Sequence, residues 1–370
     1  MFKNKTSRQI KNERMLDFYR NYEKEISPLI EKYEGERKIR AVIFTVIAIF
    51  ATCFLATYLA TYIYYVLLFP FLLLVVVLVT YAIVMLISYR FITRGLQNKI
   101  KKEVLQKLIC SLGNINWIPE KNIIDNEMLR QSELFSTYNT RSNDDTFEGE
   151  YNGLSFKISE TNLTQVSGSG RNRRVDRVFN GVIILIDSNK TTNSKTIIAT
   201  KGDQNIRNNA TGTIATIFSS VIIIVLGYLL KDTFKIGIGI FLLIVFSLLA
   251  LCQKIDNEKE MSSMELEDPE FNKKYNAYSQ DQIEGRYLIT TSFMERFKNL
   301  HTAFGTTKAK CAFVGDKIMF ALSTHKNLFE LSEGIFCSLK DPKQTKVFYD
   351  EISAIYDIID YFKLDTKIGL

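Results

Sequence analysis

The sequence predicts an α+β cytoplasmic domain, made of antiparallel strand hairpins packed with helices, together with two transmembrane helical hairpins. Three observations lead to this prediction. Two long tracts, residues 41–89 and 211–252, are almost free of charge. Outside them, the hydrophobic pattern changes between the helical period and period two. The polar segments also carry hairpin-turn and helix-capping signals, which are typical of a folded domain.

The first apolar tract, residues 41–89, contains no charged side chain. As a single helix it would be roughly 74 Å long, against a hydrocarbon core of about 30 Å. We therefore expect a transmembrane hairpin whose turn lies near Pro70, since proline cannot continue a helix that began before it. Residues 1–40 carry eleven Lys/Arg and seven Asp/Glu and are expected to form a charged cytoplasmic helix, solvated or coiled-coil rather than bound to lipid.

The second apolar tract is broken only by KDTFK at 231–235 and predicts an inserted transmembrane hairpin over residues 206–258. Its last span is short, so it either crosses or re-enters the membrane. Basic residues flank the first hairpin and are absent from its turn, which places both termini and the soluble domain in the cytoplasm of a multi-pass inner-membrane protein. The five cysteines show no CxxC spacing, as expected in a reducing compartment.

The remaining segments, residues 90–205 and 259–370, are predicted to be two parts of one cytoplasmic domain. FEGEYNGLSFKISE (147–160) reads as a strand hairpin turning at Asn-Gly. Residues 178–200 read as a second strand pair, and residues 309–323 as a third that turns at Gly-Asp. Because two hairpins cannot bury an apolar face alone, we expect the strands on both sides of the insertion to share a core.

The stretch YSQDQIEGRYLITTSFMERF, residues 278–297, gathers acidic, basic and tyrosine side chains. We predict two short helices joined by ITT, with capping boxes at Ser279/Gln282 and Ser292/Glu295. Helix ends therefore account for much of the polar character. A final helix is expected after Asp341, with one apolar stripe. Its members are Phe348, Ile352, Ile355, Ile359 and Phe362.

Several of these segments resemble a bacterial membrane family known as domain of unknown function 3137. LEDPEFNKKYNAYSQDQIEGRYLITTSFMERF and FVGDKIMFALSTHKNLFEL resemble its C-terminal half, and DDTFEGEYNGLSFKISE and VFNGVIILID its central part. The resemblance covers roughly residues 100–205 and 263–365. It implies a transmembrane hairpin before a cytoplasmic α+β domain, and no activity. The candidate residues within these motifs are Asp144, Asp145, Gly149, Glu160, Asp281, Glu284, Arg286 and Tyr287.

The chain departs from the family pattern in three places. Gly285 stands where alanine is expected, and Thr291 stands where proline is common. The predicted second hairpin is the larger departure, because it splits the family domain.

The loop SGSGRNRRVDR, residues 167–177, is the main candidate binding site outside these motifs. It is expected either to contact an anionic lipid headgroup or phosphate, or to be a solvated hairpin tip. Its cations are Arg171, Arg173, Arg174 and Arg177.

Known catalytic motifs are absent from the sequence. It has two histidines, no P-loop and no GxSxG, so we predict no catalytic residue and no cofactor. Carboxylates offer oxygen ligands for a divalent cation, but turn and edge roles are favoured and no metal site is predicted. These carboxylates are Asp144, Asp145, Glu148 and Glu160.

The sequence thus predicts a membrane protein with a non-catalytic cytoplasmic binding or scaffolding module. The expected partners are the bilayer, anionic lipid headgroups, and a second copy or another membrane protein, but not nucleic acid. One alternative is a membrane-anchored enzyme that uses an acidic, arginine and tyrosine cluster; a more distant one is a component of a transport complex. Convergence in one pocket would favour the enzyme, whereas scattered positions would favour the binding module. The residues that would converge are Asp144, Asp145, Glu160, Asp281 and Arg286.

Overall fold

The computed structural model describes residues 7–65, 70–188, 191–203, 261–326, 328–329 and 334–367. The predicted hairpin at 206–258 lies outside the described residues. The chain divides into two units. The first, here called the helical unit, comprises residues 1–118, 147–151 and 326–356. The second, here called the sheet unit, comprises residues 119–146, 152–325 and 357–370.

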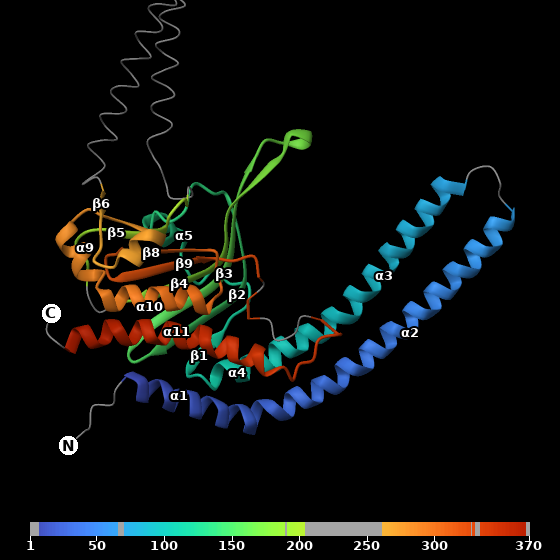
Figure 1. Cartoon of the computed structure of the whole chain (residues 1–370), viewed down its shortest axis with the longest axis horizontal. Helices are drawn as coiled ribbons and strands as arrows, with labels where there is room; N and C mark the ends of the chain where they lie inside the picture. Colours follow the sequence, from blue (N-terminus) through green and yellow to red (C-terminus); the bar gives the residue numbers. More distant parts are fainter. Residues whose placement is uncertain are drawn as a thin grey trace, which may run out of the picture. The chain divides into compact units, whose positions relative to one another are not determined.

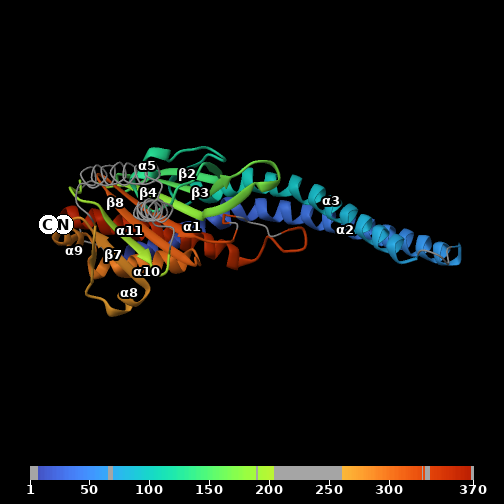
Figure 2. The ribbon, with the colours of Figure 1, turned by 90° about the horizontal axis from the view of Figure 1, so that it is seen from above.

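The helical unit begins with a helix that is continuous from Ser7 to Tyr65. It consists of α1 (Ser7–Asn21), a π-helical turn (Tyr22–Ile26) and α2 (Ser27–Tyr65). The predicted charged helix therefore runs directly into the first apolar tract. Next come α3 (Pro70–Ile100), a second π-helical turn (Lys101–Leu105) and α4 (Gln106–Cys110). α2 and α3 lie side by side in both views (Figures 1 and 2).

Two long apolar N-terminal helices were predicted, and both are present. Each is long and apolar enough to cross a membrane, with mean hydropathies of 2.4 and 2.2 over its most apolar stretch. None of the residues in either stretch is buried within the described structure. Pro70 begins α3, as expected for a residue that cannot continue the preceding helix.

Aromatic contacts hold the rest of the helical unit together. Strand β1 (Asn114–Trp117) pairs antiparallel with residues 147–150 of strand β2 (Thr140–Tyr151). Helix α11 (Pro342–Lys367) contributes its first part. On this helix, Tyr349 packs on Phe18 with ring centroids 5.0 Å apart, and Tyr356 stacks on Tyr151 at 4.0 Å.

In the described residues, the sheet unit has eight strands in the order β2-β3-β4-β9-β8-β5-β7-β6. Their bounds are β2 Thr140–Tyr151, β3 Leu154–Ser167, β4 Arg174–Asp187, β5 Thr196–Thr200, β6 Ser262–Met264, β7 Tyr275–Ser279, β8 Lys308–Val314 and β9 Lys317–Ser323. β4 pairs antiparallel with β9, and β5 pairs antiparallel with both β7 and β8. Strands from before residue 204 and after residue 260 therefore interleave in one sheet.

Helices and loops cover the two faces of this sheet, which confirms the α+β prediction. The helices are α5 (Asn126–Gln131), α8 (Pro269–Lys274), α9 (Gln282–Leu288) and α10 (Thr291–Ala303). On one face α10 lies along the strands (Figure 1), and its Phe293 contacts Phe313 and Phe362. On the other face, the segment that includes α5 packs Leu129 and Phe135 into a cluster with Ile183 of β4.

Residues 178–200 do not form the predicted strand pair. β4 and β5 are both strands, but β9 and β8 lie between them. The tight β8–β9 hairpin pairs along both of its edges, with β4 on one side and β5 on the other. Strand periodicity indicates that a segment is extended, but it does not specify its neighbour.

The capping residues in the 278–297 stretch also differ from prediction. Ser279 belongs to β7, and the cap of α9 is Asp281, whose carboxylate accepts from the amides of Ile283 and Glu284. Thr290, not Ser292, caps α10 by accepting from the Phe293 amide. Gly285 fits a close approach of α9 to the sheet, because a Cβ there would lie 2.9 Å from the Cβ of Ser279.

Candidate functional site

The candidate site is built on a hairpin that extends beyond the sheet. β4 pairs with β9 only over Gly181–Asp187, whereas its pairing with β3 continues to Ser167 opposite Arg174. The register shifts between Leu163 and Thr164, where this extension begins. We call residues 164–177 the arm; Figure 1 shows it as a two-stranded projection from the sheet.

Glycine makes the turn at the tip of the arm possible. Gly168 has φ +72° and Gly170 has φ +58°, and a short 3-10 turn spans Gly170–Asn172. A Cβ at Gly168 would lie 2.3 Å from the carbonyl oxygen of Asn172. The glycines flanking Ser169 are therefore required by backbone geometry and do not indicate a nucleotide-binding loop.

The arm concentrates positive charge on exposed side chains. It carries four arginines and one acid, Asp176. Arg173, Arg174 and Arg177 are all exposed. Arg174 pairs with Asp176 at 2.9 Å, while among the described residues no ion pair involves Arg173 or Arg177. Two cations are therefore available to an anionic ligand without the loss of an existing ion pair.

The strand register places the base of the arm at the same edge of the sheet as the end of β5. Gly181 lies opposite Ser323 of β9, which in turn lies opposite Lys308 of β8. At the end of β5, Thr200 exchanges hydrogen bonds with Ala309, the neighbour of Lys308. We call this side of the sheet, which is formed by strand ends and not by an edge strand, the arm edge.

A buried ion pair holds the chain where it leaves β5. The Lys310 ammonium lies 3.0 Å from an Asp203 carboxylate oxygen and donates to the Leu134 carbonyl at 2.8 Å. Both side chains are almost fully buried. Burial lowers the pKa of Lys310, and the Asp203 carboxylate opposes that shift. Asp203 is the last described residue before residue 261, so its position is set at the arm edge.

Three of the predicted acidic candidates do converge. The carboxylates of Asp144, Asp145 and Glu160, on β2 and β3, have oxygens within 4.8 Å of one another. Such a group of oxygens suits a hard divalent cation. Each of the three side chains also interacts with other residues of the protein.

The candidates on α9 have structural roles instead. Asp281 is the helix cap described above. Glu284 accepts from the backbone amides of Asn193 and Ser194 at 2.9 and 2.8 Å, and also from the Ser194 hydroxyl. It therefore fixes the loop that leads into β5. Arg286 and Tyr287 lie on the exposed side of the helix.

The two groups of candidates do not meet. Four strands, β4, β9, β8 and β5, lie between β3 and β7, which precedes α9. At about 4.8 Å per strand spacing, this separation is roughly 24 Å. Gly149 belongs to the helical unit, where it lies opposite Ile115 of β1. The single acidic and arginine pocket that an enzyme would need is not formed by these residues.

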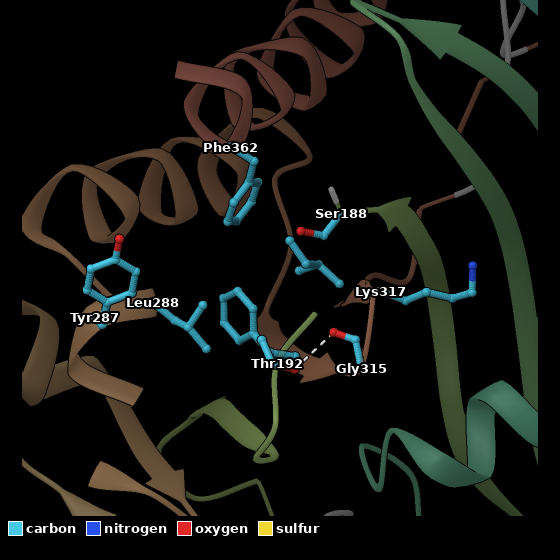
Figure 3. A pocket seen from close by; sticks show the side chains of 9 residues that line it. Ser188, Thr192, Tyr287, Leu288, Gly315, Lys317 and Phe362 are labelled. Carbon is cyan, nitrogen blue, oxygen red and sulfur yellow. Dashed lines mark hydrogen bonds between the residues drawn. The ribbon is translucent and has the colours of Figure 1, made fainter. Parts of the chain in front are cut away.

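A small cavity lies beside α9 and the β8–β9 turn (Figure 3). Tyr287, Leu288, Phe313, Lys317 and Phe362 contribute to its wall. Its volume is about 20 Å³, which suits one water molecule and not a substrate. Lys317 is paired with Asp187 at 2.7 Å and does not provide a free charge there.

Two polar features were missed by sequence reasoning. One is the Asp203–Lys310 pair, because the lysine has apolar neighbours in a strand and its partner lies far away in the chain. The other is the environment of His301, one of the two histidines in the sequence. Its Nδ1 lies 2.5 Å from the Tyr275 hydroxyl, and its Nε2 lies 2.9 Å from the Thr306 carbonyl. The carbonyl can only accept, so Nε2 carries a hydrogen. Burial lowers the pKa of His301 below its usual 6.5, which favours the neutral ring at pH 7, and in that tautomer Nδ1 accepts from the Tyr275 hydroxyl.

The family model described as "Protein of unknown function (DUF3137)" matches residues 177–364, just over half of the chain. The chain belongs to this family. The match confirms the resemblance seen in the sequence and runs through residues 206–258. It begins at Arg177, so the motifs upstream of that residue lie outside it.

No curated protein matches the chain. Among solved structures, the DUF3137 protein is similar to "crystal structure of the mycobacterial trehalose monomycolate transport factor A, TtfA". The two share 12% sequence identity with a TM-score of 0.33, over 70% of this chain and 96% of that one. A TM-score this low carries no argument about fold or role.

Proposed function

We propose that this DUF3137 protein is a multi-pass inner-membrane protein whose cytoplasmic α+β domain is a non-catalytic binding module. The apolar stretches of α2 and α3, in which no described residue is buried, support membrane insertion. A bilayer would remove that apolar surface from water, at a gain of about 25 cal/mol per Å². The uncharged composition of residues 236–252 and most of 206–230 supports a second membrane hairpin.

The specific ligand that we propose is the anionic headgroup surface of the inner leaflet, bound by the arm. The observation that carries this proposal is the strand register. It supports a geometry in which the arm arginines and the exit from β5 share one edge of the sheet. Since the predicted membrane hairpin begins directly after that exit, the arm edge faces the bilayer.

Other cations at the arm edge support the same ligand. Lys201 and Lys274 are both exposed and are joined by a backbone hydrogen bond of 2.8 Å. Lys308 is partly exposed at the end of β8. Each basic residue near an anionic leaflet contributes roughly 1 kcal/mol, so the arm edge as a whole can hold the domain against the membrane.

The scattered positions of the motif candidates argue against the enzyme alternative. Asp281 and Glu284 are used for capping and loop anchoring, and the acidic cluster at Asp144 lies several strands away. The small cavity beside α9 is too small for a substrate. A binding module needs neither a pocket nor a catalytic constellation, only an accessible charged surface.

Lipid retention by the full chain tests the proposal. Detergent-purified protein is loaded with phosphatidylglycerol or phosphatidylcholine, and native mass spectrometry counts the lipids that remain bound. Arg173→Gln/Arg177→Gln is compared with a control of equal charge change, Arg286→Gln/Lys157→Gln. We expect the arm variant, and not the control, to lose phosphatidylglycerol. Raised salt should weaken the same binding, because exposed charges are screened.

Equal retention by the two double variants would contradict lipid binding by the arm. Equal retention of both lipids by the wild type would contradict recognition of anionic headgroups. Either result would leave the arm as a solvated hairpin tip.

A further inference from the structure

A short segment of the helical unit, residues 334–339, is bound tightly to α2. Glu34 and Arg37 form a buried ion pair at 2.6 Å on that helix. Arg37 also donates to the Ile335 carbonyl at 2.5 Å, and Glu34 accepts from the Leu339 amide at 3.0 Å. Two side chains about one helical turn apart therefore bind the segment by hydrogen bonds at two points.

These hydrogen bonds are strong because they are charged and shielded from water. Relative exposures are 5% for Glu34 and 8% for Arg37. Charge-assisted hydrogen bonds are about twice as strong as neutral ones. The Arg37 guanidinium, helped by the Leu339 amide, lowers the pKa of Glu34 to about 2. The carboxylate therefore stays ionised at neutral pH and holds the segment in place.

The tightly held segment exposes a large aromatic ring. Phe336 is 59% exposed, although its neighbours Ile335 and Leu339 are buried. Its ring stacks on Tyr89 of α3 at 6.2 Å and meets Phe44 of α2 edge-on at 5.9 Å. The two helices thus support one side of the ring and leave the rest uncovered.

The three rings of Phe336, Tyr89 and Phe44 lie where the charge-free tract of the helices ends, and this position indicates what covers Phe336. Tyr89 is the last residue of the charge-free tract, and Phe44 is in its first turn. Arg40 and Arg90 lie just outside the tract. Aromatic side chains gather at this boundary in membrane proteins, where one part of the ring is in hydrocarbon and another near the headgroups.

We propose that residues 334–339 form an additional membrane contact, with Phe336 inserted into the interfacial zone of the inner leaflet. The inference rests on the proposed crossing of α2 and α3. The occupant is lipid because the exposed ring continues the exposed apolar surface of these two helices. The ion pair of Glu34 and Arg37 holds the segment at a fixed depth.

Fluorescence quenching in the full chain tests this inference. The sole tryptophan, Trp117, is changed to phenylalanine, and one tryptophan is introduced at a time. Phe336→Trp reports on the segment. Phe54→Trp, 74% exposed on α2, reports on the span, and Ile283→Trp, 83% exposed on α9, is the soluble control. Each variant is placed in nanodiscs that contain brominated lipid, and circular dichroism checks its fold.

We expect lipid quenching at positions 54 and 336 and none at 283. Quenching at 54 without quenching at 336 would overturn the inference and leave the proposed crossing intact. An absence of quenching at both would overturn the crossing itself. Equal quenching at 336 and 283 would also overturn the inference, since the segment would then be no nearer to lipid than the control surface.

Discussion

The helical unit and the sheet unit each fix a backbone segment with a buried ion pair, but the pairs are built differently. In the helical unit, Glu34 and Arg37 lie one turn apart on the same helix and reach outward to the 334–339 segment. In the sheet unit, Lys310 of β8 meets Asp203, which follows β5. The first pair is local in sequence, whereas the second joins segments that are distant in sequence.

This difference in sequence separation determines which other parts of the fold each ion pair needs in order to form. The helix alone brings Glu34 and Arg37 together, so this pair exists before the segment binds. The Asp203–Lys310 pair requires β5 and β8 to be paired in the sheet, and its lysine also donates to the Leu134 carbonyl. The Glu34–Arg37 pair can therefore form first and then bind residues 334–339. The Asp203–Lys310 pair can form only after the strands around it have paired.

The largest expected loss of stability comes from removing the lysine of the Asp203–Lys310 pair. Lys310→Met leaves the Asp203 carboxylate buried without its main partner, which costs roughly 3–5 kcal/mol of the free energy of unfolding. Urea denaturation of the full chain in detergent measures this change. Lys308→Met is the control, because its side chain is 42% exposed and its pair with Asp203 is longer, at 3.6 Å.

The control should lose less than about 1 kcal/mol, as exposed ion pairs do. Asp203→Leu/Lys310→Met should recover much of the loss, because neither charge is then left alone. If Lys310→Met were as mild as Lys308→Met, the pair would not hold the exit from β5.

A smaller effect is expected from breaking the local pair. Arg37→Met removes charged hydrogen bonds worth roughly 1.5–3 kcal/mol, but Glu34 keeps the Leu339 amide. Hydrogen exchange of the amides in residues 334–340 should therefore accelerate, while exchange in β8 and β9 is unchanged. Lys38→Met, an exposed neighbour on α2, is the matched control. Unchanged exchange in the segment would show that Arg37 does not hold it.

The smallest expected effect is a difference between the two units in how their stability depends on pH. Burial lowers the pKa of His301 below its usual 6.5, so the neutral ring stabilises the sheet unit fully above pH 6.5 and less as the pH falls. Glu34 has a pKa lowered from 4.5 to about 2, so its contribution to the helical unit is lost only between those values. Acidification from pH 7.5 to 5.5 should therefore weaken the sheet unit alone.

Denaturation midpoints at pH 7.5 and 5.5 measure this difference. His301→Gln keeps a donor and an acceptor near Tyr275 and Thr306 but does not titrate. We expect this variant to reduce the pH dependence. If the wild type and His301→Gln lost the same stability on acidification, His301 would not be the titrating group.

Local patterns were enough to predict many of the elements. The Asn152–Gly153 and Gly315–Asp316 turns, the apolar stripe of α11 and the two long apolar helices all follow from short-range signals. The order of the strands does not follow from them, because the apolar residues of β5 indicate a buried strand but do not specify which strands pair along its two edges. Ser279 illustrates the same limit: its spacing to Gln282 suits a capping box, but β7 takes it into the sheet.

The candidate site was only partly predictable for a related reason. The arm arginines could be recognised because the glycines and charges are contiguous in the sequence. Which edge of the sheet they share with the end of β5 depends on pairings across distant segments. Lys310 could not be recognised at all, since a lysine in a strand gives no sign that an aspartate will meet it inside the protein.

The place of β5 between β7 and β8 has a consequence for biosynthesis. β3 and β4 can pair as soon as they leave the ribosome, but both neighbours of β5 are encoded after residue 260. About 110 residues separate the end of β5 from the start of β8, and at ~5–20 residues per second their translation takes roughly 5–20 s. During that interval β5 lacks β8, and until β7 has been translated it lacks both neighbours, while β4 has one open edge. The open edges of β4 and β5 must therefore avoid pairing with other strands until the β8–β9 hairpin has been translated.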